Sequence, residues 1–241
     1  MSKLPACLLS TAYFPPVSYF AALANAETAV IERCETYQKQ SYRTRCHIYS
    51  ANGLLVLTLP VLRTVPAVPA AGLAAQAPTH KADIREIRVD YTKPWLQQHK
   101  RALEAAYCSS PFFEYYRDDL FAVLDRREES LLELNTALTE LLAELIGLSV
   151  RVAGTDSYRE TAPPGTADLR RLIHPKRKGP APLQVWGMEK PYYQVFSGKQ
   201  GFLPDLSVLD LLFNEGPESI SYLKMPDASR LLRLSEPESE R

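Results

Sequence analysis

The densest group of side chains that could bind an anion lies between residues 37 and 45. Arginine offers paired, planar donors and lysine a mobile charge, so both suit a phosphate or a carboxylate. If this segment is extended, alternation places Lys39, Arg43 and Arg45 on one side as a cradle. The alternative is a solvated strand face, but solubility alone does not require the tyrosines or the glutamine, which favour a pocket. The group comprises Tyr37, Lys39, Gln40, Tyr42, Arg43 and Arg45.

A second basic region runs from residue 151 to residue 178 and contains the sequence His174-Pro175-Lys176. Seven basic residues stand against three acidic ones there, a local excess of four. Such a region would attract a diphosphate, a coenzyme or a nucleic-acid backbone. It lacks the interleaved aromatic residues of a groove for single strands, and an exposed charged loop is the alternative. The basic residues are Arg151, Arg159, Arg170, Arg171, Lys176, Arg177 and Lys178, and the acidic ones are Asp156, Glu160 and Asp168.

Two histidines are candidates for proton transfer. His99 lies on the apolar face of a predicted helix, one turn after Trp95 and one turn before Leu103. A histidine in that position is more often a hydrogen-bonded core residue than a catalyst. If His99 and His174 converge near the basic cradle, they would supply a general base and an acid for acyl or glycosyl transfer.

Other common chemistries lack their motifs. The four cysteines form no Cys-x-x-Cys pair and no zinc-type arrangement with the histidines. Cys46, beside Arg45, and Cys108 are possible nucleophiles, with packing the more common role for such residues. No Gly-x-Ser-x-Gly elbow, phosphate loop or dinucleotide fingerprint occurs. The acidic pair Asp118-Asp119 fits an exposed helix face better than a metal site. We therefore predict no metal, and no cofactor can be named.

Charge and hydropathy limit the partners. Lys and Arg number 28, as do Asp and Glu, so no overall field would gather nucleic acid or an anionic membrane. No segment reaches the roughly 20 apolar residues that span a bilayer. The N-terminal stretch has neither the apolar region nor the cleavage site of a signal peptide. We expect a cytoplasmic protein with reduced thiols, no nucleic-acid partner and no membrane span.

The N-terminal third of the chain favours strands. Residues 5–12 and 29–32 are short apolar runs, and residues 87–91 alternate between apolar and charged side chains. Between residues 46 and 61, Asn52-Gly53 separates two runs rich in β-favouring residues and predicts a hairpin in which both residues take positive φ angles. Residues 62–80 are rich in Ala and Pro and predict a flexible surface loop.

The middle of the chain predicts helices. Pro94 begins one helix, Ser110-Pro111 begins a second, and a leucine stripe over residues 128–146 marks a third that ends at Gly147. Further on, residues 150–152 and 191–196 predict strands. Ser207 with Asp210 resembles a capping box in front of an apolar helix at 208–213. Together these elements predict an α/β fold, with a mixed α+β arrangement as the alternative, in one domain over residues 1–234 and a frayed tail at 235–241.

An ordered set of short motifs resembles the WbqC-like protein family over nearly the whole chain. The N-terminal part of this set includes Tyr13-Phe14-Pro15-Pro16 and Tyr42-Arg43-x-Arg45, and the C-terminal part includes His174-Pro175-Lys176 and Tyr193-Gln194-Val195-Phe196. The chain departs from the family pattern at Thr44, where an asparagine is common, and in the long stretch at 62–80. The set also contains Glu35, Tyr37, Lys39-Gln40, Pro60-Val61, Trp95, His99, Ala106-Tyr107, Pro111-Phe112-Phe113, Tyr116, Phe202-Leu203 and the run Leu206–Gly216.

The resemblance implies a role in bacterial surface polysaccharide (O-antigen) biosynthesis. Transfer of an acyl or aminoacyl group to an amino sugar is the expected reaction, with a small anionic or nucleotide-sugar ligand. The alternative is a non-catalytic binding or assembly protein whose apolar helix at 208–213 docks a partner enzyme. The oligomeric state is left open. The expected catalytic residues are His99 and His174, and the expected substrate-binding residues are Tyr13, Tyr37, Lys39, Gln40, Arg43, Arg45, Lys176 and Gln194.

Overall fold

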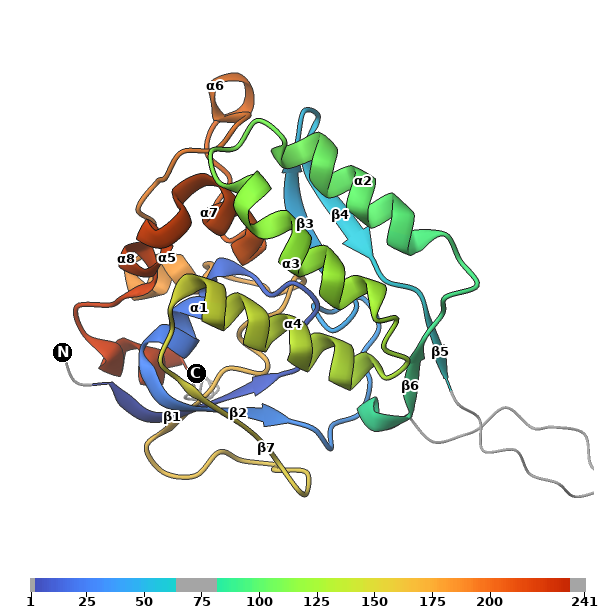
Figure 1. Cartoon of the computed structure of the whole chain (residues 1–241). Coiled ribbons are helices and arrows are strands. Elements are labelled where there is room, and N and C mark those ends of the chain that lie inside the picture. Colours follow the sequence, from blue (N-terminus) through green and yellow to red (C-terminus); the bar gives the residue numbers. More distant parts are fainter. Residues whose placement is uncertain (1–2, 64–81, 235–241) are drawn as a thin grey trace, which may run out of the picture.

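A parallel sheet of four strands lies at the centre of the molecule. The computed structural model describes residues 3–63 and 82–234. The strand order is β7-β2-β1-β8, with helices packed against the sheet and two small antiparallel pairs beside it (Figure 1). The predicted α/β fold is confirmed. The four strands are β1 (Leu4–Ser10), β2 (Ala26–Glu32), β7 (Arg151–Gly154) and β8 (Thr166–Asp168).

The first two strands are joined by α1 (Val17–Ala24), a helix that the sequence pattern does not reveal. Every residue of α1 is buried, so the helix lacks the polar face by which an amphipathic helix is recognised. It begins directly after Pro16, whose extended conformation suits the N-cap position. β1 and β2 themselves confirm the two predicted apolar strands, and they pair in parallel.

β7 and β8 complete the sheet on opposite sides. β7 pairs with β2 and confirms the strand predicted at 150–152. β8 pairs with β1 over only three residues, too few for a visible alternation between the proline-glycine loops that flank it. The chain therefore runs from β1 to β2 to β7 in one direction across the sheet and then places β8 on the other side of β1.

All four strands end at the same edge of the sheet, which we call the carboxyl edge. Ser10 lies opposite Glu32, Ile31 lies opposite Gly154, and Leu8 lies opposite Asp168. In open α/β sheets, ligands bind outside this edge, at the point where the strand order reverses. Here that point lies between β1 and β8.

The predicted hairpin is present as β3 (Arg45–Ser50) and β4 (Gly53–Thr58). Its turn differs from the expected one. Gly53 pairs with Ser50, so Ala51 and Asn52 form the turn. Gly53 takes a φ of 98°, whereas Asn52 is not among the described residues with positive φ. The expectation of two positive φ angles is wrong for Asn52 because the turn lies one residue earlier in the sequence.

A second antiparallel pair follows the hairpin. β5 (Val61–Arg63) pairs with β6 (Ile87–Val89), which confirms the strand predicted near residue 87 and follows the short helix η1 (Ile84–Glu86). Leu62 and Arg63 therefore belong to a strand and not to the predicted loop, because their main chain is paired with β6. Residues 64–80 of that loop and the predicted tail at 235–241 lie outside the described residues.

The three predicted helices of the middle region are confirmed as α2 (Trp95–Tyr107), α3 (Phe113–Asp125) and α4 (Leu131–Ile146). The Ser130 side chain caps α4 by accepting a hydrogen bond from the Glu133 backbone N–H, and Gly147 ends it with a φ of 77°. α2 lies against the β3–β4 hairpin, and α3 packs beside α4 (Figure 1). This layer covers the interior and leaves the carboxyl edge to be lined by loops.

Short helices make up the C-terminal part. The strand predicted at 191–196 is wrong, since this segment is irregular. Pro191 has no N–H to donate, and the Gln194 side chain bonds both the N–H and the C=O of Leu203 in place of a strand partner. The elements are α5 (Pro182–Trp186), α6 (Ser197–Gln200), α7 (Val208–Glu215), η2 (Gly216–Glu218), α8 (Ser219–Leu223) and η3 (Ala228–Leu234).

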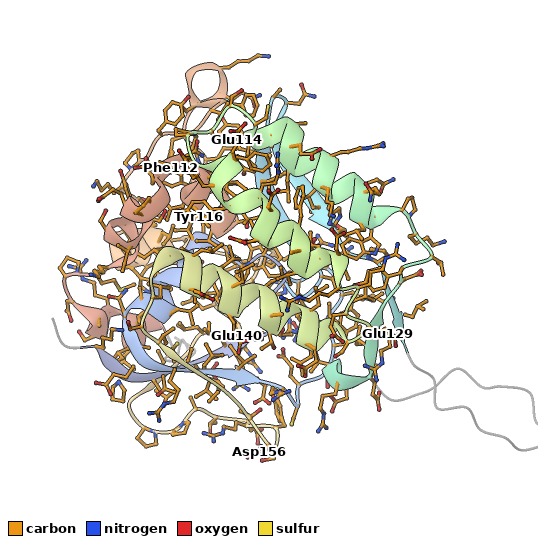
Figure 2. All side chains as sticks on the ribbon, viewed as in Figure 1. Phe112, Glu114, Tyr116, Glu129, Glu140 and Asp156 are labelled. Carbon is orange, nitrogen blue, oxygen red and sulfur yellow. The ribbon has the colours of Figure 1, made fainter. Side chains whose placement is uncertain are left out.

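α7 is the apolar helix expected at 208–213, and it lies in the core. Its residues from Val208 to Asn214 are all buried, so it presents no surface for the docking role considered above. The capping-box expectation is wrong, because the Asp210 carboxylate bonds side chains from other segments and only Ser207 caps the helix. Phe112, labelled at the start of α3 in Figure 2, packs on Gly216, where a Cβ would lie 2.6 Å from its ring.

Candidate functional site

An open cleft of about 1000 Å³ lies at the carboxyl edge. Three loop regions form its walls: the segment after β2, the segment after β7 that follows Asp156 (labelled in Figure 2), and the segment after β8. Most of its lining residues are of polar types, among them arginines, carboxylates and hydroxyls. The lining residues are Glu35, Thr36, Gln38, Arg43, Tyr158, Glu160, Thr161, Ala162, Pro163, Pro164, Gly165, Thr166, Asp168, Arg170, Arg171, Leu172, Arg177 and Leu232.

The wall that follows β7 is fixed to the sheet by Glu32 and Arg170. The fully buried Glu32 carboxylate accepts from the Thr155 hydroxyl at 2.6 Å and from the Arg159 backbone N–H at 3.0 Å. Arg170 forms a two-bonded pair with Asp168 and also donates to the Arg159 carbonyl at 2.6 Å. Because Glu32 and Asp168 belong to β2 and β8, these bonds tie the loop to the sheet and preorganise this side of the cleft.

Arg43 forms an ion pair with a carboxylate of the chain itself, that of Glu35. Its side chain is buried, and its guanidinium donates to both carboxylate oxygens of Glu35, with Nε to Oε1 at 2.8 Å. It also donates to the Ser10 hydroxyl at 2.8 Å. The expected extended segment is absent, because residues 39–44 form turns in which Gln40 takes a φ of 57°. Arg43 therefore reaches the cleft as one half of an ion pair and not as part of a row with Lys39 and Arg45.

The two basic regions of the sequence meet beside the cleft. The Lys176 ammonium donates to the Gln40 side-chain carbonyl, and the Lys176 backbone N–H donates to His174 Nδ1 at 3.1 Å. Burial lowers the pKa of His174, and the positive charges of Arg43, Lys176 and Arg45 lower it further. His174 is thus a neutral imidazole at neutral pH. Since Nδ1 accepts a hydrogen bond, Nε2 carries the proton.

His99 lies elsewhere, in the core. Its Nδ1 bonds the Tyr13 hydroxyl at 2.9 Å, and its ring packs on Trp95 with centroids 5.2 Å apart. Burial lowers its pKa to about 4, opposed only by a hydrogen bond with the Thr58 backbone. Neither His99 nor Tyr13 lines the cleft. The structure therefore does not bring His99 and His174 together around it.

Gln194 belongs to a third polar group, around Asp210. The Asp210 carboxylate accepts hydrogen bonds from the Gln194 amide and the Tyr192 hydroxyl at 2.8 Å, and from the Tyr107 hydroxyl at 3.0 Å. Burial raises the pKa of Asp210 to about 6 in spite of these donors. With its other bonds to Leu203, Gln194 has no remaining group directed to the cleft.

The remaining expected binding residues lie near the cleft without lining it. Lys39 is exposed, and Tyr37 is half-buried with its backbone N–H bonded to the Ala82 carbonyl. Sequence reasoning named Arg170 and Asp168 within the second basic region but missed β8, the strand that places them at the wall of the cleft. It gave no role to Tyr158. Recognising β8 as the strand that pairs with β1 would have placed Asp168 and Arg170 at the carboxyl edge.

The two candidate cysteines differ in exposure. Cys46 is fully buried, and burial raises its thiol pKa far above the ordinary value. This confirms packing for Cys46 and removes the expectation that Arg45 favours its thiolate. Cys108 is exposed, so packing is wrong for this residue. Within residues 3–63 and 82–234, no group of three or more His, Cys, Asp or Glu side chains could hold a metal ion.

Across the same two ranges, no helix is both long and apolar enough to cross a bilayer.

Comparison with known proteins adds a family and one relative. Residues 11–174 match the model of the WbqC-like protein family, and this match includes the hairpin, the helical layer and the walls of the cleft up to His174. The uncharacterized protein Rv1507c of Mycobacterium tuberculosis is 28% identical over 239 residues, which cover 90% of this chain and 96% of that protein. No solved structure matches the chain.

Proposed function

Because the chain belongs to the WbqC-like protein family, we propose that it is a transferase of bacterial surface polysaccharide biosynthesis, of the O-antigen type. The substrate is a nucleotide-linked amino sugar held in the cleft, and the reaction is transfer of an acyl or aminoacyl group to its amine. The observation that carries this proposal is the cleft at the point of strand-order reversal, lined by arginines, carboxylates and hydroxyls.

The size and lining of the cleft support a ligand of this class. Ligand pockets commonly enclose about 300 to 1,000 Å³, and this cleft, at about 1000 Å³, is at the large end of that range. Carboxylates such as Asp168 and hydroxyls such as that of Thr161 suit the many hydroxyl groups of a sugar. Arginine suits the phosphates that link the sugar to a nucleoside.

The role of His174 in such a reaction follows from its tautomer. When an amine attacks the carbonyl of an activated acyl donor, the C–N bond forms, the carbonyl oxygen becomes negative, and the amine must lose a proton. The oxyanion then collapses, the bond from the carbonyl carbon to the donor's leaving group breaks, and the leaving group departs with a proton. His174 Nδ1 is occupied by the Lys176 N–H, so Nε2–H is the donor that this proposal assigns to the developing oxyanion. His174 itself lies beside the cleft and is not one of its lining residues. The amine proton then needs another acceptor. Glu160 lines the cleft, and its carboxylate has no ion-pair partner among the described residues.

A cytoplasmic location is part of the proposal. All four cysteines are free thiols, which is the usual state in a reducing compartment.

The test uses the polysaccharide itself. The gene is deleted in the source organism, and the repeating unit is measured by mass spectrometry before and after complementation. We expect the deletion to remove an acyl or aminoacyl mass from the repeat, the wild-type gene and the control Arg151→Gln to restore it, and His174→Ala to restore it poorly. An unchanged repeat in the deletion strain would contradict the proposed function.

A further inference from the structure

The cationic side chains at the cleft fall into two groups that differ in charge compensation. Arg43 is paired with Glu35, and Arg170 is paired with Asp168 and Glu32. In contrast, no ion pair within the part of the chain that the structure describes involves Arg45, Arg171, Lys176 or Arg177. Three of these four cations, Arg45, Lys176 and Arg177, lie around His174.

Two of these side chains also leave a buried donor unused. The Nε atoms of Arg45 and Arg177 are buried, and neither has a hydrogen-bond partner among the described residues. A buried donor left unsatisfied on a charged group is strongly unfavourable. Natural proteins rarely leave such groups without a partner, and one explanation is an ion or ligand that binds there. An acceptor from outside the chain would bind the outer N–H groups of these two guanidiniums, because the buried Nε atoms themselves have no accessible surface.

The side chains concerned surround His174. The Arg177 backbone N–H donates to the His174 carbonyl at 3.1 Å, and the Lys176 backbone N–H donates to the imidazole. Arg45 lies close enough to the imidazole to act on it electrostatically. Arg177 also lines the cleft, together with Arg43 and Gln38. These residues therefore form one group, which contains Arg45 at the start of β3 and Arg177 in the segment after β8.

We propose that Arg45, Lys176 and Arg177 form a phosphate subsite beside His174, at the end of the cleft near β3. Its ligand is the diphosphate of a nucleotide-linked sugar, so the proposal rests on the function proposed above and specifies where the phosphates bind. A diphosphate fits better than a carboxylate, because a single carboxylate carries one charge and would leave most of the three cations uncompensated. Phosphoryl oxygens accept charge-assisted hydrogen bonds from guanidinium N–H groups, often two at once.

In this assignment Arg43 is a positioning residue. Its guanidinium orders Glu35 and Ser10 at the carboxyl edge, and it does not bind the phosphate, because Glu35 already compensates its charge. This separates Arg43 from Arg45, although the two lie two residues apart in one sequence motif.

Calorimetric titration of the full chain with inorganic pyrophosphate at low salt tests the subsite. We expect binding that weakens as salt rises, and a Kd at least about tenfold higher in Arg45→Gln and in Arg177→Gln. Arg151→Gln is the matched control, an exposed arginine at the start of β7, and should bind as the wild type does. The Kd of Arg45→Lys should lie between those of the wild type and Arg45→Gln, since lysine keeps the charge and loses the planar donors. Equal affinity in wild type, Arg45→Gln and Arg177→Gln, or no binding by the wild type, would overturn the proposal.

A second measurement requires no variant and so does not depend on folding of the mutants. Phenylglyoxal modifies accessible guanidinium groups, and modified peptides are identified by mass spectrometry. Pyrophosphate should protect Arg45 and Arg177 in the wild-type protein and leave Arg151 reactive; equal modification with and without pyrophosphate would overturn the subsite. Because both measurements use pyrophosphate, an unchanged polysaccharide with intact pyrophosphate binding would reject the transferase function alone, and loss of an acyl mass without pyrophosphate binding would reject the subsite alone.

Discussion

Two groups of buried polar side chains, one at the carboxyl edge and one in the interior, differ in how completely their hydrogen-bonding capacity is met. In the interior, Tyr13 pairs with His99, and three donors saturate Asp210. At the carboxyl edge, Arg45 and Arg177 each retain a buried donor without a partner among the described residues. Both groups contain titratable residues with perturbed pKa values, so a perturbed pKa does not distinguish a ligand site from a folded core. Unsatisfied neutral atoms also occur in the core, on Trp95, Asn135 and Trp186. What distinguishes the carboxyl edge is that its unsatisfied donors belong to charged guanidinium groups without an ion-pair partner among the described residues.

Arg43 and Glu35 line the cleft, yet we expect their buried ion pair to stabilise the fold and not to bind the ligand. Glu35→Gln leaves a buried guanidinium without its counterion and should lower the free energy of unfolding by about 3 to 5 kcal/mol, measured by urea denaturation. Glu133→Gln is the control, because its pair with Arg33 is exposed, at 52% and 44% of the side-chain areas, and should change stability by less than about 1 kcal/mol. A similar small loss in both variants would mean that the Arg43 pair is not structural.

The pH dependence of stability sharpens the interior half of the comparison. The folded pKa of His99 is about 4 against an ordinary 6.5, so the unfolded chain binds this proton more readily. The stability that neutral His99 contributes is present in full above the unfolded pKa of 6.5. It is lost as pH falls toward 4, by about 3 kcal/mol in total. His99→Gln, which keeps a donor and an acceptor without titrating, should lose stability less steeply in acid. Parallel stability curves for wild type and variant would contradict a buried neutral His99.

The stability that depends on Asp210 should change with pH in the opposite direction to that of His99. Its folded pKa is about 6 against an ordinary 3.8, so the folded protein binds this proton more readily and gains stability as pH falls from about 6 toward 3.8. Asp210→Asn removes that gain, which is also about 3 kcal/mol. Urea denaturation at a series of pH values should therefore give variant-minus-wild-type differences of opposite slope for the two residues. Slopes of the same sign would show that one of the two burial assignments is wrong.

A smaller effect isolates the hydrogen bond between Tyr13 and His99. Tyr13→Phe removes the hydroxyl and leaves the buried Nδ1 without its partner, which should destabilise the fold by about 1 to 3 kcal/mol. Pyrophosphate affinity should not change, because neither residue lines the cleft. Tyr115→Phe, at a position that is 76% exposed, should stay within about 0.5 kcal/mol of the wild type. Loss of pyrophosphate binding in folded Tyr13→Phe would connect the interior group to the ligand site.

The elements that the sequence predicts are those whose pattern is local. Asn52-Gly53 identifies the β3–β4 hairpin, and the leucine stripe with Gly147 identifies α4. α1 and β8 have no such pattern, because α1 is buried on every side and β8 owes its position to pairing with β1. Both determine where the carboxyl edge lies. The strand order, and with it the location of the cleft, therefore depends on tertiary pairing that no short window of sequence contains.

The candidate site divides in the same way. The sequence identifies the two basic regions, and the contact between Lys176 and Gln40 brings them together. It does not distinguish Arg43 from Arg45, because compensation of Arg43 depends on Glu35, which a loop folds back onto it. His99 and Gln194 belong to the same set of family motifs as the cleft residues, yet their hydrogen-bond partners, Tyr13 and Asp210, lie in the core. Residue type and spacing predict which groups are present, and only the fold decides which remain unpaired.

The smallest expected effect concerns Tyr158, an aromatic residue of the cleft wall. Its ring lies over Arg170, 5.6 Å from the guanidinium carbon to the ring centroid, and 55% of the residue is exposed. A nucleobase could stack on the exposed face and add about 1 kcal/mol to binding. Tyr158→Ala should therefore weaken binding of a nucleoside diphosphate about fivefold and leave pyrophosphate affinity unchanged in calorimetric titrations. Tyr193→Ala is the matched control, equally exposed but outside the cleft. If both variants weaken nucleoside diphosphate equally, Tyr158 is not a stacking surface and the phosphate subsite stands without it.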